Sequence, residues 1–129
     1  MVMAFLLDTH TFIWLTANSP SLPETLRETI DTAETVYLSI ASLWEIAIKL
    51  QLGKLSLHQD YELIGAEVEA SDILLLPIEF SDTVQVRNLE LHHRDPFDRM
   101  LIAQAINRTL VIISNDEKFD AYEVERLWQ

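Results

Sequence analysis

Apolar segments of two kinds alternate along the chain. Short runs of consecutive apolar and β-branched residues are typical of strands that are buried on both faces. Between them lie longer segments whose apolar residues recur every three or four positions, which predicts helices. The predicted strands are residues 3–7, 36–39, 73–77 and 110–113, with a weaker fifth near 124–128. The predicted helices are residues 11–16, 24–33, 41–52, 60–70, 81–91 and 96–107.

Uniformly apolar strands that alternate with helices indicate a parallel sheet with helices on both faces. The chain has 129 residues, 49% of them apolar, and only 2 Gly and 4 Pro, which favours one compact domain over a disordered or repeated chain. No repeat, low-complexity tract or linker interrupts the pattern. We therefore predict an α/β fold, a three-layer α/β/α sandwich in which residues 1–129 form a single domain.

The formal net charge of −12 restricts the possible partners. Phosphate binding normally needs a basic surface, so this charge argues against a simple nucleic-acid-binding module. An acidic protein can still act on phosphodiesters if divalent cations supply the positive charge at the site. It can also bind a basic protein partner.

The chain contains no cysteine, which excludes disulfides and thiolate zinc sites. This composition suits a reducing cytosol. The apolar run at residues 1–7 is too short for a signal sequence or a membrane span, and we interpret it as a buried strand. We expect a cytoplasmic protein with no membrane partner.

Residues 92–105 concentrate two carboxylates, two arginines and two imidazoles at the start of an apolar helix. Asp95 is a favoured N-cap residue, and Pro96 suits the first helical position because its missing N–H would be unpaired there. Asp98 falls in the first turn, where the helix dipole favours an anion. A capping charge is therefore the simpler explanation of Asp98, unless other segments bring carboxylates to the same place.

Three further acids can reach that place. Asp8 directly follows the first strand and Asp116 follows the fourth strand after two residues, so a parallel sheet brings both to its carboxyl edge. Glu45 lies in the helix after the second strand, and Asp98 in the helix before the fourth. Two carboxylates about 4 Å apart repel by roughly 4 kcal/mol at an effective dielectric of about 20. Such a cluster is costly unless some of the acids stay protonated or a cation lies among them, and oxygen ligands without cysteine favour Mg²⁺ or Mn²⁺.

Each acid also has a local explanation. Asp8 could cap the helix that follows it, and Asp116 could form an Asx-type turn. Glu45 could complete a capping box with Ser42, or pair with Lys49 one turn later. The sequence pattern alone leaves these alternatives open.

Four segments that carry the acids resemble the motifs of PIN-domain ribonucleases, and most closely those of the VapC-like toxins of type II toxin–antitoxin pairs. The resemblance extends from Phe5 to about Tyr122. The segments are Leu6-Leu7-Asp8-Thr9-His10, Ser39-x-x-Ser42-x-Trp44-Glu45-Ile46-Ala47-Ile48-Lys49, Asp95-Pro96-Phe97-Asp98-Arg99-Met100-Leu101-Ile102-Ala103-Gln104-Ala105 and Ser114-Asn115-Asp116-x-x-Phe119.

The resemblance implies a five-stranded parallel sheet of order 3-2-1-4-5 and a metal-dependent endoribonuclease that hydrolyses RNA. It implies a catalytic and metal-binding quartet, with Thr9 and Ser114 as supporting hydroxyls, although the family usually has Thr where Ser114 stands. It also implies a homodimer that a cognate antitoxin inhibits. The quartet is Asp8, Glu45, Asp98 and Asp116.

Arg94, Arg99 and Lys49 are candidates to hold substrate phosphates, although ordinary surface charge would also explain them. We interpret His10, His92 and His93 as packing or loop residues. The three tryptophans and Phe12 are expected in the core or at an interface.

Two other functions compete with the nuclease. A phosphatase that forms an aspartyl-phosphate also begins with a strand-end aspartate, but it needs a second acid two residues later, where this chain has His10. The second alternative is a catalytically inert acidic interaction module that dimerises and binds a basic partner.

Overall fold

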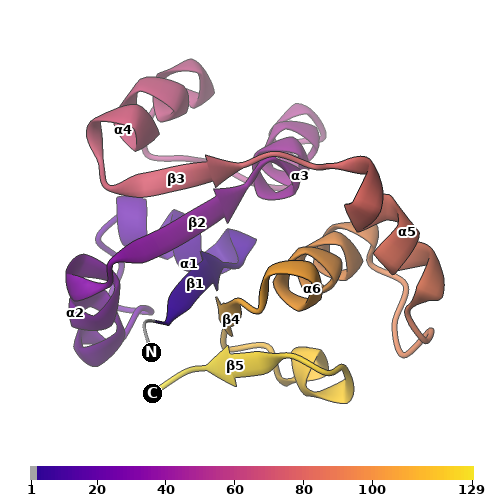
Figure 1. The fold of residues 1–129 in the computed structure, drawn as a ribbon. Coiled ribbons are helices and arrows are strands. Elements are labelled where there is room, and N and C mark those ends of the chain that lie inside the picture. The colour runs from indigo at the N-terminus through magenta and orange to yellow at the C-terminus, as the bar shows by residue number, and fades with distance from the viewer. Residues whose placement is uncertain (1–2) are drawn as a thin grey trace.

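The computed structural model describes residues 3–129 and contains one five-stranded parallel sheet of order β3-β2-β1-β4-β5 (Figure 1). Leu6 in the central strand is paired with Tyr37 on one side and Ile112 on the other. The predicted fold class and strand order are confirmed. The strands are β1 (Ala4–Leu7), β2 (Thr35–Ser39), β3 (Ile73–Leu76), β4 (Val111–Ile113) and β5 (Glu125–Leu127).

Six α-helices and two 3-10 turns connect these strands in the described part of the chain. The helices are α1 (Thr9–Thr16), α2 (Glu24–Thr32), α3 (Ile40–Gln51), α4 (Ile64–Ala70), α5 (Phe80–Asn88) and α6 (Pro96–Arg108), and the 3-10 turns are η1 (Tyr61–Leu63) and η2 (Glu117–Ala121). None of these helices, within residues 3–129, is long and apolar enough to cross a membrane.

Helix boundaries differ from the prediction where side chains cap the backbone. Helix α1 begins two residues earlier than predicted, because the Asp8 carboxylate accepts a hydrogen bond from the Thr11 N–H at 2.9 Å and caps the helix. The predicted helix at residues 60–70 is divided into η1 and α4, and α5 ends at Asn88 instead of residue 91. Residues 1 and 2 of the predicted first strand lie outside the described residues.

The alternation of side chains along the strands divides the core between the two faces of the sheet. Phe5 and Leu7 pack in one buried cluster with residues of α1, α2, α3 and α4. Leu6 and Ile112 point to the other face and pack with α6 and η2. The edge strand β3 departs from the predicted burial, since Leu74 and Leu75 are exposed there.

Within residues 3–129, three helices end at a residue in a left-handed backbone conformation, and the first is α1, which is followed by Asn18 with φ of 51°. Gly53, with φ of 69°, follows the C-cap of α3 in the C′ position, where glycine is favoured. Thr109 ends α6 with φ of 54°, although it is not a glycine. This turn directs the chain from α6 into the buried strand β4.

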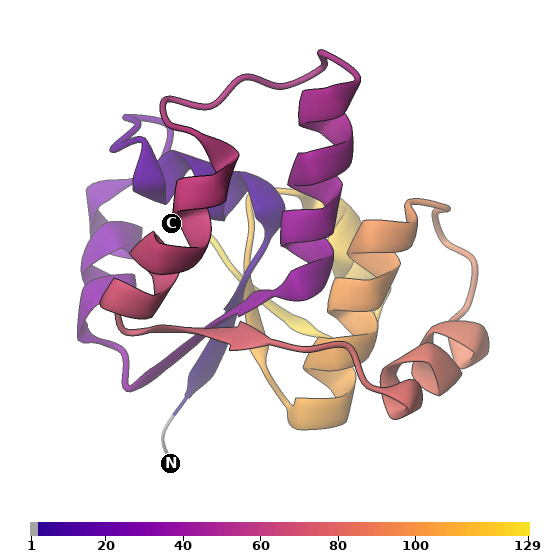
Figure 2. The same ribbon diagram turned by 90° about the horizontal axis from the view of Figure 1, so that it is seen from above.

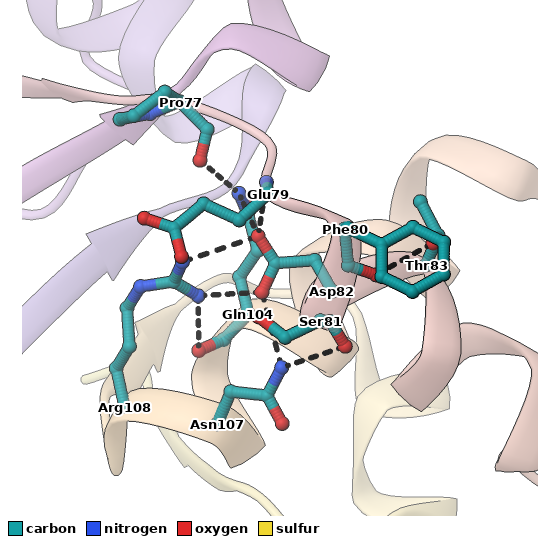
Figure 3. A network of polar contacts seen from close by, with 9 residues as sticks. All are labelled: Pro77, Glu79, Phe80, Ser81, Asp82, Thr83, Gln104, Asn107 and Arg108. Atoms are coloured by element: carbon teal, nitrogen blue, oxygen red, sulfur yellow. Dashed lines mark hydrogen bonds and ion pairs between the residues drawn. The ribbon is translucent and has the colours of Figure 1, made fainter.

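Helix α5 packs on α6 at the outside of the molecule (Figure 2). A polar network around Asp82, which is fully buried, connects the two helices (Figure 3). The Asp82 carboxylate accepts hydrogen bonds from Arg108 at 2.7 and 3.1 Å, from the Asn107 amide at 3.1 Å and from the Glu79 N–H at 2.9 Å. Every buried carboxylate oxygen here has a donor, so the network fixes α5 to α6.

Candidate active site

The four acids of the predicted quartet line one open cleft of about 520 Å³. They come from four separate segments: Asp8 from the end of β1, Glu45 from α3, Asp98 from α6 and Asp116 from the turn after β4. The parallel sheet brings these segments together at the carboxyl ends of its strands. The other lining residues are Thr9, His10, Trp14, Lys49, Asp95, Asn115 and Lys118.

Asp8 is held at the end of β1 by a donor on each oxygen. Its Oδ1 accepts from the Thr11 N–H, and its Oδ2 accepts from the Ser114 hydroxyl at 2.6 Å. The Asp116 N–H donates to the same Ser114 oxygen at 3.0 Å. Ser114 therefore connects the end of β1 to the turn after β4. Asp8 caps α1, as one explanation from the sequence proposed, and it also lines the cleft.

Glu45 is buried in α3 with a donor on each oxygen. Its Oε1 accepts from the Thr9 hydroxyl at 2.7 Å, and its Oε2 is 2.5 Å from the Lys49 ammonium. The proposed capping box with Ser42 is wrong, because Ser39 is the N-cap of α3 and Ser42 lies inside the helix. The alternative pairing with Lys49 is confirmed.

Asp95 and Asp116 each use one oxygen to accept from the local backbone. Asp95 Oδ1 accepts from the N–H groups of Phe97 at 2.9 Å and Asp98 at 3.0 Å, which confirms its predicted capping role. Asp116 Oδ1 accepts from the Lys118 N–H at 3.0 Å in the expected Asx-type turn. The second carboxylate oxygen of each residue is not used in these turns, and both residues line the cleft.

Asp98 differs from the other acids of the cleft in the surroundings of its carboxyl group. Within residues 3–129, its carboxyl accepts no hydrogen bond and forms no ion pair. Burial, followed by the negative charges of Asp95, Glu45, Asp8 and Asp116, raises the pKa of Asp98 from 3.8 to about 7. The cleft therefore carries more negative charge than its own cations neutralise.

The three predicted phosphate contacts lie in different environments, and Arg99 is buried. Its guanidinium donates to the backbone carbonyls of Glu90 at 2.9 Å and Val86 at 3.1 Å, and to the Tyr122 hydroxyl at 3.2 Å. These bonds fix the segment between α5 and α6. The prediction that Arg99 contacts substrate is therefore corrected: this arginine organises the protein interior.

Arg94 is exposed, but it borders an adjacent groove of about 280 Å³ instead of the acidic cleft. Trp44 and Phe97 line this mainly apolar groove, with their rings edge to face at a centroid distance of 5.3 Å. Trp44 is 58% exposed, so it is not a core residue. Trp14 and Trp128 are partly buried against the core, as expected.

Lys118 is the basic cleft residue that the sequence analysis missed. Its signal was its place two residues after Asp116, inside the last motif segment. Lys49, which was predicted as a phosphate contact, also lines the cleft. His10 reaches the cleft beside Trp14, with a ring-centroid distance of 5.9 Å, whereas His92 and His93 pack against Tyr122.

The chemistry of the cleft fits a hard divalent cation, because its candidate ligands are carboxylate oxygens. The uncompensated charge at Asp98 supports the same ligand class. In the described range 3–129, no three His, Asp or Glu side chains form a compact group around one point. The fit to a cation therefore rests on the carboxylate chemistry of the cleft lining and on the raised pKa of Asp98.

Comparison with known proteins identifies the family. A family model described as the PIN domain matches residues 5–125. The chain belongs to the PIN domain family. No curated protein matches the sequence of this PIN domain.

Several solved structures share the fold of this PIN domain. A chain of DNA-bound VapBC from Salmonella typhimurium is 20% identical, with a TM-score of 0.71 and 98% of both chains covered. A chain of VapBC2 from Rickettsia felis, bound to a DNA fragment from its promoter, is 14% identical, with a TM-score of 0.74 and coverage of 97% and 98%. A chain of FitAcB from Neisseria gonorrhoeae is 20% identical, with a TM-score of 0.65 and coverage of 95% and 96%.

Proposed function

We propose that this PIN domain is a metal-dependent endoribonuclease. The observation that carries the proposal is the cleft itself, where four acids from separate segments meet and one of them, Asp98, has a pKa raised to about 7. Carboxyl groups whose charged form is destabilised by burial and by like charges cluster at functional sites.

In this proposal, Asp8, Asp98 and Asp116 would hold Mg²⁺ or Mn²⁺, and Glu45 would either join them or orient the attacking water. The metal would lower the pKa of a bound water and neutralise charge on the phosphate. Hydrolysis forms a bond from the water oxygen to phosphorus and breaks the bond from phosphorus to the 3′ oxygen. The products are a 5′-phosphate and a 3′-hydroxyl.

The substrate must approach a protein of net charge −12. Lys49 and Lys118 line the cleft, and Arg94 is exposed at its side, so these cations are the candidates to contact RNA phosphates. Thr9 and Ser114 support the acids through their hydrogen bonds to Glu45 and Asp8.

We also propose that the chain is the toxin of a type II toxin–antitoxin pair, acts in the cytoplasm and forms a homodimer that an antitoxin inhibits. The VapBC, VapBC2 and FitAcB structures among its structural neighbours support this proposal. The apolar groove with Trp44 beside the cleft supports a protein partner, because large exposed apolar patches commonly mark interfaces. The same groove also favours the second candidate function, a catalytically inert interaction module.

The test is cleavage of labelled structured RNAs by the purified chain in Mg²⁺ or in EDTA, beside Asp98→Asn. We expect cleavage that requires the metal. Asp98→Asn should reduce the rate roughly 100-fold or more, because a metal centre supplies several kcal/mol of transition-state stabilisation.

Asp31→Asn is the matched control, since Asp31 is exposed in α2 and does not line the cleft. It should cleave at the wild-type rate. Equal cleavage by wild type and Asp98→Asn, with or without EDTA, would show a contaminating nuclease. Absence of cleavage of every RNA, with retained binding of a protein partner, would favour the inert module.

A further inference from the structure

Lys49 occupies a special position among the cations of the cleft. In the part of the chain that the structure describes, it is the residue whose ammonium forms an ion pair with a carboxylate of the quartet, 2.5 Å from Glu45 Oε2. The other Glu45 oxygen accepts from Thr9. Both oxygens of Glu45 therefore have a donor within the protein.

Local helix chemistry holds Lys49 in this position. Glu45 and Lys49 are four residues apart on α3 with the acid first, which is the favourable order for a helical ion pair. Lys49 lies in the last turn of α3, where the helix dipole favours a cation. The hydrogen bond to Glu45 raises the pKa of Lys49 despite its partial burial, so the ammonium stays charged.

The negative charge of the cleft is therefore divided unequally. Glu45, which is 4% exposed, has a fixed cation and a hydroxyl donor. Asp98, on the facing helix α6, has no donor within residues 3–129. A divalent ion that enters the cleft meets an Asp98 carboxyl that has no donor among residues 3–129, and a Glu45 carboxylate whose two oxygens already have donors.

We propose that Lys49 takes the place of a second metal ion: it neutralises Glu45 and keeps this carboxylate out of the metal's coordination sphere, so that the cleft binds one divalent ion. The ion then depends on Asp8, Asp98 and Asp116, and Glu45 is a positioning residue that acts through Lys49 and Thr9. This inference rests on the proposed function only in requiring that a divalent ion binds in the cleft.

The test is calorimetric titration of the full chain with Mn²⁺ in the absence of RNA. Wild type should bind one ion. Glu45→Gln, which retains an oxygen and the shape of the side chain, should change the Kd by less than about 3-fold. Asp98→Asn should weaken the Kd by roughly 10-fold or more, in the range seen when groups that support metal sites are lost.

Lys49→Gln removes the fixed cation and can still donate to Glu45. It should strengthen Mn²⁺ binding or add a second bound ion. Lys54→Gln is the matched control, because Lys54 is exposed just beyond α3 and does not line the cleft, and it should behave as wild type. Circular dichroism of each variant confirms that it is folded.

Two results would overturn the inference while leaving the nuclease proposal intact. One is two Mn²⁺ ions per wild-type chain, and the other is a loss of affinity in Glu45→Gln as large as that in Asp98→Asn. Absence of Mn²⁺ binding by wild type would reject the metal site and the inference together.

Discussion

Asp82 and Asp98 are both aspartates in the first turn of a helix. Asp82 is fully buried and Asp98 is partly buried, yet their surroundings shift their pKa values in opposite directions. Burial alone would raise the pKa of Asp82, but hydrogen bonds from Arg108, the Glu79 N–H and Asn107 hold it below its usual value. Burial and four neighbouring carboxylates raise the pKa of Asp98 to about 7. The difference lies in the partners, because the local helical position is the same.

The comparison separates a structural acid from a candidate functional one. The Asp82 network is complete and internal, and it holds α5 against α6 (Figure 3). The Asp98 carboxyl faces a cleft lined by further acids. Carboxyl pKa values shifted in this way cluster at functional sites, where a ligand can supply the opposite charge.

The largest effect on stability is expected from Asp82→Ala. This change leaves Arg108 and Asn107 without their main acceptor in a buried network, so the free energy of unfolding should fall by about 3 kcal/mol. Urea denaturation measures the loss, and Asp31→Ala, at an exposed site, should remain within about 0.5 kcal/mol of wild type. Equal stability of Asp82→Ala and wild type would contradict the claim that the Asp82 network stabilises the fold.

Asp98→Asn, measured in EDTA, is expected to increase the free energy of unfolding. Because the folded-state pKa of Asp98 is raised, its contribution to stability is present below about pH 4 and is lost as the pH rises through about 7. Asparagine does not ionise, so the variant should match wild type at pH 4 and exceed it by about 2 kcal/mol at pH 8, allowing for solvent screening. Denaturation at both pH values measures this difference, and a variant less stable than wild type at pH 8 would contradict it.

A smaller effect on stability should distinguish Arg99 from Arg94, which were both predicted to contact substrate phosphates. Arg99→Lys loses the branched set of bonds to Val86, Glu90 and Tyr122, and it should cost about 1 kcal/mol in the free energy of unfolding. Arg94→Lys, at an exposed site, should change stability by less than about 0.5 kcal/mol. The thermal unfolding midpoints of the two variants test this assignment, which fails if Arg94→Lys is the less stable.

The fold class could be predicted because the apolar pattern of each strand and helix lies within a short segment of the sequence. Uniformly apolar strands alternating with helices gave the parallel sheet, and the motif resemblance gave the strand order. Boundaries were missed where a side chain decides them, as at Asp8, which caps α1 and starts the helix earlier than the apolar pattern indicates.

The convergence of the four acids on one cleft could also be anticipated, because each follows or flanks a strand end. The contact partners of the basic residues could not be predicted from the sequence. Arg99 is adjacent to Asp98 in sequence, but helical geometry sends its side chain inward toward Tyr122. Lys118 was missed because its place in the last motif segment does not by itself show whether its side chain lines the cleft, as it does. Such assignments depend on contacts between segments that are distant in the sequence.

The most direct test of the account is the number of protons released when Mn²⁺ binds, measured by calorimetry at pH 7 in buffers of different ionisation enthalpy. A carboxyl with a pKa of about 7 is half protonated at that pH, so wild type should release roughly half a proton per ion bound. The release should rise toward one proton at pH 5 and vanish at pH 9. Binding without proton release at pH 5, or the same release from Asp98→Asn, would contradict the claim that the uncompensated charge of Asp98 is what the metal neutralises.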